Sequence, residues 1–136
     1  KEYFKKKYIG LINPEYIKFI VDKDDKLIAF SIVMPSFSEA LQKAKGKLFP
    51  FGFLYLLRAK KHSKSVLFYL IGIDPEYQNK GVTAIVFDEY YKAFKKNNIE
   101  TCIRTPELEE NHAIHNMWKH FNPVVHKRRR TYRKDL

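Results

Sequence analysis

The chain has 136 residues, of which 45% are hydrophobic and 15% are aromatic. This length is typical of a single domain, and the apolar content is large enough to offset the entropy of ordering the backbone, which excludes a disordered protein. The 26 Lys and Arg residues exceed the 15 Asp and Glu residues and give a net charge of +11. So basic a chain favours anionic partners, among them phosphorylated cofactors, nucleic acids and lipid headgroups.

Cysteine and histidine usage narrows the kinds of site that the chain can form. Cys102 is the only cysteine, which excludes an intramolecular disulfide and a cysteine cluster and fits a reducing cytoplasm. We expect Cys102 to be a small buried hydrophobe rather than a nucleophile. His112 and His115 have the spacing to share one helix face, but no third ligand accompanies them at metal spacing. The sequence therefore predicts no metal site.

Neither a membrane span nor a signal peptide is expected. No apolar run approaches the roughly 18 residues that suggest a span, and the basic start of the chain lacks an apolar core. We therefore expect a cytoplasmic protein. Because the chain begins with Lys1 rather than Met, we expect a piece of a longer protein; the alternative is a processed product. A companion domain N-terminal to this chain is a candidate partner.

The first predicted element is a β-hairpin over residues 16–34. Two β-branched or aromatic runs, 16–22 and 26–34, are separated by the turn-forming segment Lys23-Asp24-Asp25. Pro35 ends the second strand.

A helical insert is predicted over residues 35–65. Ser36 and Glu39 have the spacing of a capping box, which predicts a short helix to about Lys45 with Gly46 as its C-terminal cap.

The remainder of this insert is first apolar and then basic. Residues 48–57 are almost entirely apolar, and the next seven residues, 58–64, are a basic run that contains Arg58, Lys60, Lys61 and Lys64. We expect a core helix with a solvated end. The alternative is an apolar surface that faces a substrate or a partner.

Strands and helices alternate in the second half of the chain, which predicts a mixed α/β domain. Residues 66–71 form an apolar run typical of a central strand buried on both faces. A helix is predicted from the following glycine turn to about Lys96, and a strand over 99–105. A final helix is predicted from four apolar residues at helical spacing, namely Ile114, Met117, Trp118 and Phe121.

The junction between the buried strand and the long helix is the most informative segment. The first amides of a helix have no intrahelical acceptor, and the helix dipole adds partial positive charge there, so such an end binds phosphate. Gly81 lies in the turn and would let a pyrophosphate approach the backbone, because a side chain there would stand between the amides and the anion.

This junction resembles motif A of the GNAT superfamily of acyl-CoA N-acyltransferases. The family pattern is a strand that ends in an apolar residue, any residue and proline, followed by Gln or Arg, two residues, glycine, one residue and then Gly or Ala. Ile73-Asp74-Pro75 and Gln78-Asn79-Lys80-Gly81-Val82-Thr83 follow this order, with Thr83 in place of the last Gly or Ala. The resemblance implies a fold of the α+β type, with a mixed, mostly antiparallel central sheet flanked by helices.

Binding of acetyl-CoA or another acyl-CoA as co-substrate is implied by the same resemblance, with residues 66–121 as the binding core. The implied cofactor-binding residues are Ile73, Gln78, Asn79, Lys80, Gly81, Val82 and Thr83. Downstream, Asn111, Ile114 and Trp118 resemble the family's Asn-x-x-Ala-x-x-x-Tyr helix. Asn111 and Trp118 are therefore further candidates, although an indole N–H cannot replace the tyrosine hydroxyl as an acid.

The implied reaction transfers an acyl group from a thioester to an amine that the sequence does not identify. A carboxylate base is absent between Ser65 and Ile73, which leaves Tyr69, acting through water, as the candidate; the alternative is a core aromatic. The backbone amide of Leu70 or Ile71 would stabilise the oxyanion. Without these functions the chain would be an inactive GNAT-like domain that binds an anionic ligand or a companion domain.

The C-terminal segment, residues 122–136, is predicted to be a basic strand or arm. Lys127-Arg128-Arg129-Arg130 is its densest cationic run. We expect these cations to be solvated or to face an acidic ligand or companion domain. No helix-turn-helix, zinc-finger or aromatic RNA-binding pattern accompanies them, which disfavours specific nucleic-acid recognition. The family's first strand and helices are not recognisable before Tyr16, so the N-terminal part of the fold is expected to be missing or truncated.

Overall fold

The computed structural model describes residues 12–134, which form two compact units divided after Arg104. In the first unit, a short 3-10 helix η1 (Pro14–Tyr16) leads into β1 (Ile17–Val21) and β2 (Leu27–Pro35). The later strands are β3 (Ser65–Ile73) and β4 (Thr101–Arg104).

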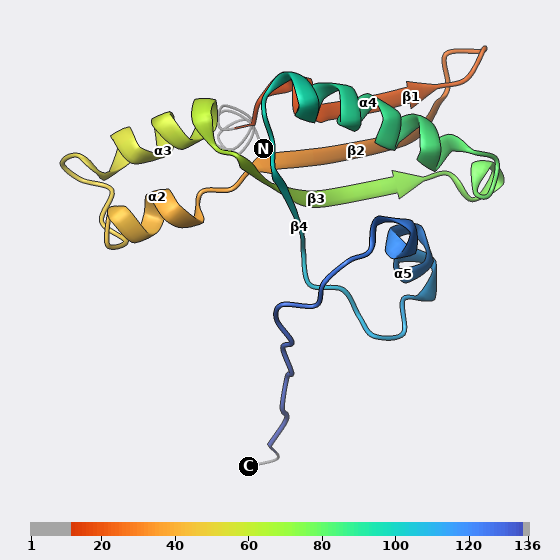
Figure 1. Ribbon diagram of the computed structural model, residues 1–136. Helices are drawn as coiled ribbons and strands as arrows, with labels where there is room; N and C mark the ends of the chain where they lie inside the picture. Colours follow the sequence, from red (N-terminus) through yellow and green to blue (C-terminus); the bar gives the residue numbers. More distant parts are fainter. Residues whose placement is uncertain (1–11, 135–136) are drawn as a thin grey trace. The chain divides into compact units, whose positions relative to one another are not determined.

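These strands form one sheet in the order β1-β2-β3-β4 (Figure 1). β1 pairs antiparallel with β2, β2 pairs antiparallel with β3, and β3 pairs parallel with β4. The predictions of an N-terminal hairpin and of a mixed, mostly antiparallel sheet are confirmed. The parallel pair follows from the helix that connects β3 to β4, since a parallel connection needs such a crossover.

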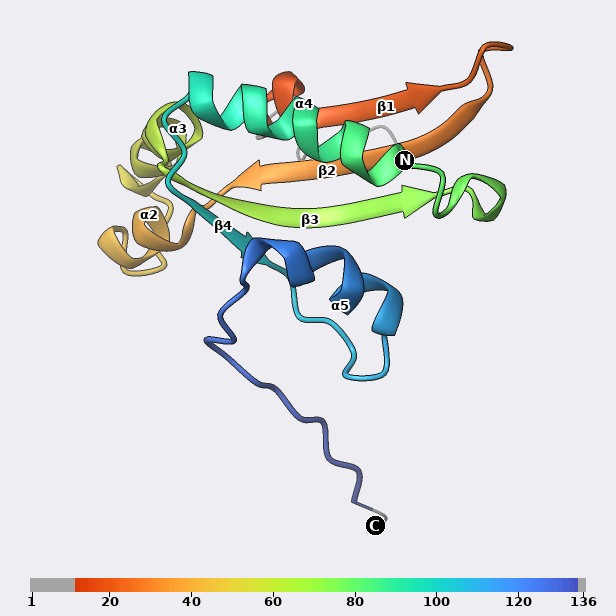
Figure 2. The ribbon, with the colours of Figure 1, turned by 45° about the vertical axis from the view of Figure 1, so that its right-hand side comes forward.

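The long helix α4 (Val82–Lys96) lies along one face of this sheet (Figures 1 and 2). Tyr90 is its central core residue: its ring packs edge-on against Phe68 of β3 at 5.3 Å, and its hydroxyl donates to the Tyr16 carbonyl at 3.1 Å. Burial raises the pKa of Tyr90 to about 12, so the hydroxyl stays a donor. The buried residues of this layer include Ala29, Ser31, Val33, Val66, Phe68, Val82, Val86 and Ala93.

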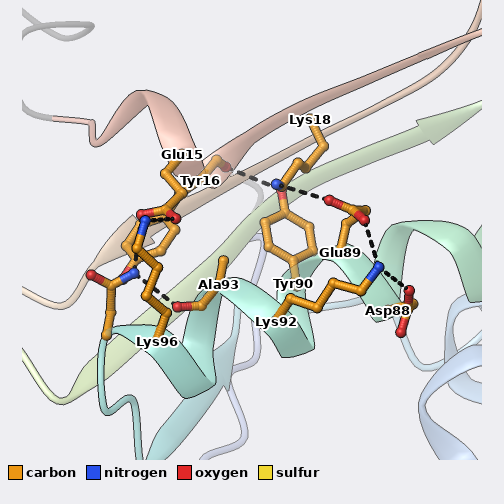
Figure 3. Close-up of polar contacts among 10 residues, drawn as sticks. Glu15, Tyr16, Lys18, Asp88, Glu89, Tyr90, Lys92, Ala93 and Lys96 are labelled. Carbon is orange, nitrogen blue, oxygen red and sulfur yellow. Dashed lines mark hydrogen bonds and ion pairs between the residues drawn. The ribbon is translucent and has the colours of Figure 1, made fainter.

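Ion pairs join the polar edge of α4 to η1 and β1 (Figure 3). Lys96 Nζ lies 2.9 Å from Glu15 of η1, and Glu89 lies 3.6 Å from Lys18 Nζ of β1. Asn97 caps the helix by donating to the Ala93 carbonyl at 2.8 Å and thereby confirms the predicted end.

β3 is the central strand, as predicted, but it is not buried on both faces along its whole length. Val66 and Phe68 are buried, whereas Tyr69 and Leu70 are about half exposed, at 48% and 46%. The exposed part of β3 begins just beyond Phe68, where its pairing with β4 stops.

The predicted capping box does not form. Helix α2 spans Ser38–Lys43, and no side chain caps its N-terminus. Ser36 instead donates its amide to the Ser65 carbonyl at 2.8 Å, which draws it into the end of the sheet. At the other end α2 stops at Lys43 with Ala44 as its C-cap, two residues before the predicted Gly46. Gly46 completes the turn that follows, with φ of +73° and its amide bonded to the Leu41 carbonyl.

The apolar stretch forms helix α3 (Gly52–His62), and the expectation of a core helix is wrong. Phe53, Leu54 and Leu57 are 42–51% exposed. α3 packs on α2, and Gly52 at its start lies so close to the Lys47 carbonyl of the connecting loop that a Cβ there would clash.

In the second unit, helix α5 (His112–Trp118) continues into a 3-10 turn, η3 (Lys119–Phe121). The final helix is thus confirmed, and the Trp118 and Phe121 rings pack at 5.8 Å. Residues 122–134 are exposed and form neither helix nor strand, so the basic segment is an arm and the alternative of a strand is wrong. Among the helices described for residues 12–134, none is long and apolar enough to cross a membrane.

Candidate functional site

The turn between β3 and α4 is built from two successive caps. Asp74 follows β3 and accepts from the Glu76 amide at 3.0 Å, which starts the 3-10 helix η2 (Pro75–Tyr77). The chain then passes through Asn79 and Gly81, whose φ angles are +60° and +81°. Asparagine tolerates this left-handed conformation and glycine adopts it without strain, so the two residues turn the chain into α4.

The first backbone amides of α4 have no acceptor within the helix. The amides of Ala84 and Ile85 donate to the Gly81 carbonyl at 3.0 and 3.3 Å. The amides of Val82 and Thr83 have no acceptor within the helix, because they belong to its first turn. No side chain caps this end, and no acidic residue lies in the first turn. A Cβ at Gly81 would have no neighbour within 4 Å. These features fit a pyrophosphate, which needs close backbone approach and unpaired amides.

Side chains of the predicted motif have unequal roles in this turn. Gln78 points back and donates its side-chain amide to the Ile73 carbonyl at 3.4 Å, so it closes the turn. Lys80 is exposed, with its Nζ 5.4 Å from the centre of the Tyr77 ring. Val82 is buried, whereas Thr83 is partly exposed beside the open amides.

The β1–β2 hairpin holds the turn in place through groups that no sequence motif indicates. The Tyr77 hydroxyl donates to Asp22 at 3.0 Å, and Lys26 Nζ lies 3.3 Å from Asp74. Val82 packs with Ile28 and Ala29 of β2.

Two acidic groups of this anchor are held ionised. Backbone N–H groups of Lys26 and Asp24 donate to Asp22 and lower its pKa, and the amide of Glu76 does the same for Asp74. Both carboxylates are thereby engaged with the turn and its hairpin. Their hydrogen bonds stiffen the support beneath the open amides.

A bulge interrupts β3 next to the point where β4 ends. Ile32 pairs with Leu70 and Val33 pairs with Phe68, so Tyr69 is an extra residue on β3. The buried Ser31 hydroxyl donates to the Leu70 carbonyl at 3.1 Å and fixes the strand beside the bulge. The only sequence signal for Ser31 is that it is a polar residue in an apolar strand.

Strand alternation distinguishes the two candidate oxyanion donors. The Asp74 amide donates to the Ile28 carbonyl of β2 at 2.8 Å. Because the amides of a strand point alternately to its two sides, those of Gly72 and Leu70 point to the same side as that of Asp74. The Leu70 amide therefore faces β2. The Ile71 amide faces the opposite side of β3. β4 does not pair with β3 at this position, because the pairing between the two strands stops at Phe68.

Asn111 and Trp118 belong to the second unit. Asn111 caps α5, since its side-chain oxygen accepts from the Ile114 amide at 3.3 Å. The His115 ring lies 3.1 Å from the Leu108 carbonyl, so His115 has a local partner. Within residues 12–134 no three His, Cys, Asp or Glu side chains gather as metal ligands.

Cys102 lies on β4, where the residue as a whole is exposed, contrary to the expected burial. Its sulfur is nonetheless desolvated by its neighbours, which raises the thiol pKa to about 11. A nucleophilic role is disfavoured, because the thiolate is the reactive form.

A cavity of about 290 Å³ lies near the C-terminal end of α4, lined by residues that include Tyr16, Lys61 and Asn97. It is at the opposite end of the helix from Gly81 and does not belong to the turn.

Comparison with known proteins identifies the fold. No family model matches the chain. Protein YghO of Escherichia coli (strain K12) is 27% identical over 129 residues, which are 90% of this chain and 33% of that protein. The chain thus spans about a third of the length of this curated relative.

Solved structures with the same architecture include acetyltransferases. A tetramutant of the BH1408 protein from Bacillus halodurans superposes with a TM-score of 0.61 at 11% identity, covering 95% of this chain and 73% of that one. An aminoglycoside acetyltransferase from an uncultured soil metagenomic sample, in complex with sisomicin, gives a TM-score of 0.56 at 11% identity, covering 99% of this chain and 73% of that one. The chain has a GNAT-like fold, as its sequence motif predicted.

Proposed function

We propose that the chain is the acyl-CoA-binding part of an N-acyltransferase, which moves an acyl group from a coenzyme A thioester to an amine. The observation that carries the proposal is the open turn at Gly81, with its positive φ, its free space and the uncapped amides that follow. Acetyltransferases with the same fold support it. Residues 66–121 would form the binding core, and the acceptor amine is not assigned.

The amides of Val82 and Thr83 would bind the pyrophosphate at the start of α4. The helix dipole strengthens this interaction, and the Lys80 cation adds to the local positive charge. Asp22 and Asp74 lie on the supporting side, where Tyr77 and Lys26 engage them, so their charges are partly compensated.

The Ile71 amide would donate to the carbonyl oxygen that gains negative charge when the amine attacks. A donor already fixed in direction stabilises that charge without reorganising during the reaction. The Ser31 hydroxyl would act as a positioning group, because its bond to the Leu70 carbonyl fixes the adjoining peptide. The thioester supplies the activated acyl group.

Proton removal from the amine would occur through water held near Tyr69. Tyr69 is the extra residue of the bulge and is 48% exposed, so solvent reaches it. No carboxylate stands on β3 to take this role. Trp118 cannot donate a proton to the departing thiolate, so this proton would come from solvent or from another group.

Thermal shift and turnover measurements test the proposal together. A ligand at 100 times its dissociation constant stabilises a protein by about 2.7 kcal/mol, so acetyl-CoA or a longer acyl-CoA should raise the unfolding temperature visibly. Thiol release in the presence of a panel of amines then reports transfer. Absence of stabilisation by every acyl-CoA would overturn the proposal, and stabilisation without thiol release would restrict it to binding.

A further inference from the structure

The pair of helices α2 and α3 carries a surface that the proposed acyl-CoA site does not use. In both ribbon views this pair lies beyond the end of the sheet, where β2 ends and β3 begins (Figures 1 and 2). The two helices pack on each other. Ser63 joins their base to the sheet, since its hydroxyl donates to the Ser36 carbonyl at 3.2 Å.

The outer end of this pair exposes an unusual concentration of large apolar side chains. Phe49 and Phe51 are 84% and 69% exposed, and three neighbours are 42–51% exposed. Single exposed apolar residues are ordinary, but a contiguous group marks an interaction surface. We call this group the apolar tip; it consists of Leu48, Phe49, Phe51, Phe53 and Leu54.

Cations flank the apolar tip on both sides in the sequence, and acidic residues are absent. No Asp or Glu occurs between Ala40 and Ile73. The exposed cations of this stretch that form no ion pair with any residue the structure describes are called the cationic collar. They are Lys43, Lys45, Lys47, Arg58 and Lys61.

Two cations of the collar, Arg58 and Lys61, lie further along α3 than the apolar residues at its start. A helix rises 1.5 Å per residue, so Arg58 lies about 6 Å and Lys61 about 10 Å further along the axis than Leu54. Amphipathic elements that lie in a bilayer interface bury apolar groups about 5–10 Å deep and keep cations at the level of the anionic headgroups. Arg58 and Lys61 of the cationic collar have this separation from Leu54 of the apolar tip.

We propose that the α2–α3 pair attaches the protein peripherally to an anionic lipid bilayer, with the apolar tip inserted below the headgroups and the cationic collar against the phosphates. Charge favours this occupant over a second copy of the chain, whose own collar would face this one with like charge. The proposal does not depend on the acyl-CoA site.

Vesicle flotation with the full chain tests the attachment. We expect binding to vesicles of phosphatidylcholine with 30% phosphatidylglycerol at 0.1 M salt, and at least tenfold weaker binding to pure phosphatidylcholine. Raising the salt to 0.5 M should weaken the binding, because screening shortens the range of the collar's charges. Absence of binding to the anionic vesicles overturns the proposal.

Variants distinguish insertion by the tip from adsorption of other charges. Phe49→Ser, Phe51→Ser and Leu54→Ser together should weaken binding at least tenfold, while Phe19→Ser, at a 65% exposed phenylalanine of β1, should change it less than twofold. Circular dichroism checks that both variants stay folded. Unchanged binding by the triple variant, with loss on replacing Arg128, Arg129 and Arg130 by Gln, would assign the binding to the basic arm and overturn the proposal.

A fluorescence measurement reports depth directly. Phe51→Trp should gain emission that brominated lipids in the vesicles quench, whereas Phe19→Trp should not, with Trp118 contributing equally to both. Equal quenching of the two variants contradicts insertion. Self-association that the tip substitutions abolish, without vesicle binding, would show that the surface is a protein interface instead.

Discussion

Replacing Gly81 with alanine distinguishes the contribution of this glycine to stability from its contribution to acyl-CoA binding. Gly81 has φ of +81°, a conformation that costs an alanine about 1–2 kcal/mol. No atom lies within 4 Å of the added Cβ, so no steric clash adds to this cost. We therefore expect a loss of about 1 kcal/mol, which lowers the unfolding temperature of a chain of this size by about 3–5 °C.

The effect on acyl-CoA binding should be larger than this strain. The Cβ would fill the open space over the turn and push the anion away from the amides of Val82 and Thr83. A hydrogen bond to a charged group contributes about 1.5–3 kcal/mol, so weakening one or two of them should reduce the affinity about 10- to 100-fold. Gly81→Asp adds a repelling carboxylate and should abolish measurable binding.

Gly46 supplies a matched control. It has φ of +73°, and a Cβ there also meets nothing within 4 Å, but it lies in the turn after α2 rather than in the turn before α4. Gly46→Ala should therefore cost the same stability and leave acyl-CoA affinity unchanged. Differential scanning fluorimetry gives the stability of both variants, and calorimetric titration gives the affinity. Equal affinities for the two alanine variants, or wild-type affinity in folded Gly81→Asp, would refute the assignment of the turn.

The remaining predictions concern the groups that support the site. Asn111→Ala should lower stability by about 1 kcal/mol through loss of the α5 cap, whereas Asn111→Ser keeps the cap; chemical unfolding distinguishes them, and if Asn111 also contacts acyl-CoA, both variants should bind it more weakly. Ser31→Ala should cost about 1 kcal/mol and lower kcat more than it changes the acyl-CoA affinity; an unchanged kcat would show that the Ser31 bond is only structural. Tyr77→Phe should speed hydrogen exchange in residues 78–82, and unchanged exchange would argue against the hairpin anchor. Because the folded-state pKa values of Asp22 and Asp74 are lowered, their contribution to stability is present above pH ~4 and is lost as pH falls below it; unfolding titrations of Asp22→Asn should show a smaller loss between pH 5 and pH 3 than the wild type.

The sequence by itself determined the elements whose signals are local. The hairpin, the turn at Gly81 and the helix that ends at Asn97 were predictable because turn residues, a positive-φ glycine and helical periodicity act within a few residues. The GNAT-like fold followed from the order of these elements around one motif.

Only the tertiary structure decided the features that join distant segments. The predicted capping box at Ser36 does not form, because the Ser36 amide donates to the carbonyl of Ser65, 29 residues later, at the end of the sheet. The anchor between Tyr77 and Asp22 spans 55 residues, and no periodicity encodes it. Whether an amide of β3 is free depends on where β4 stops pairing, which the β3 sequence does not contain.

The exposure of the apolar tip was likewise beyond the reach of the sequence. An apolar helix has the same pattern whether it enters a core or stands outside one, since hydrophobic burial is non-directional and depends only on which surfaces are available. Here α4 already covers one face of the sheet, and α3 packs against α2 beyond the end of that sheet. The core therefore closed without α3, which left Phe49 and Phe51 facing solvent.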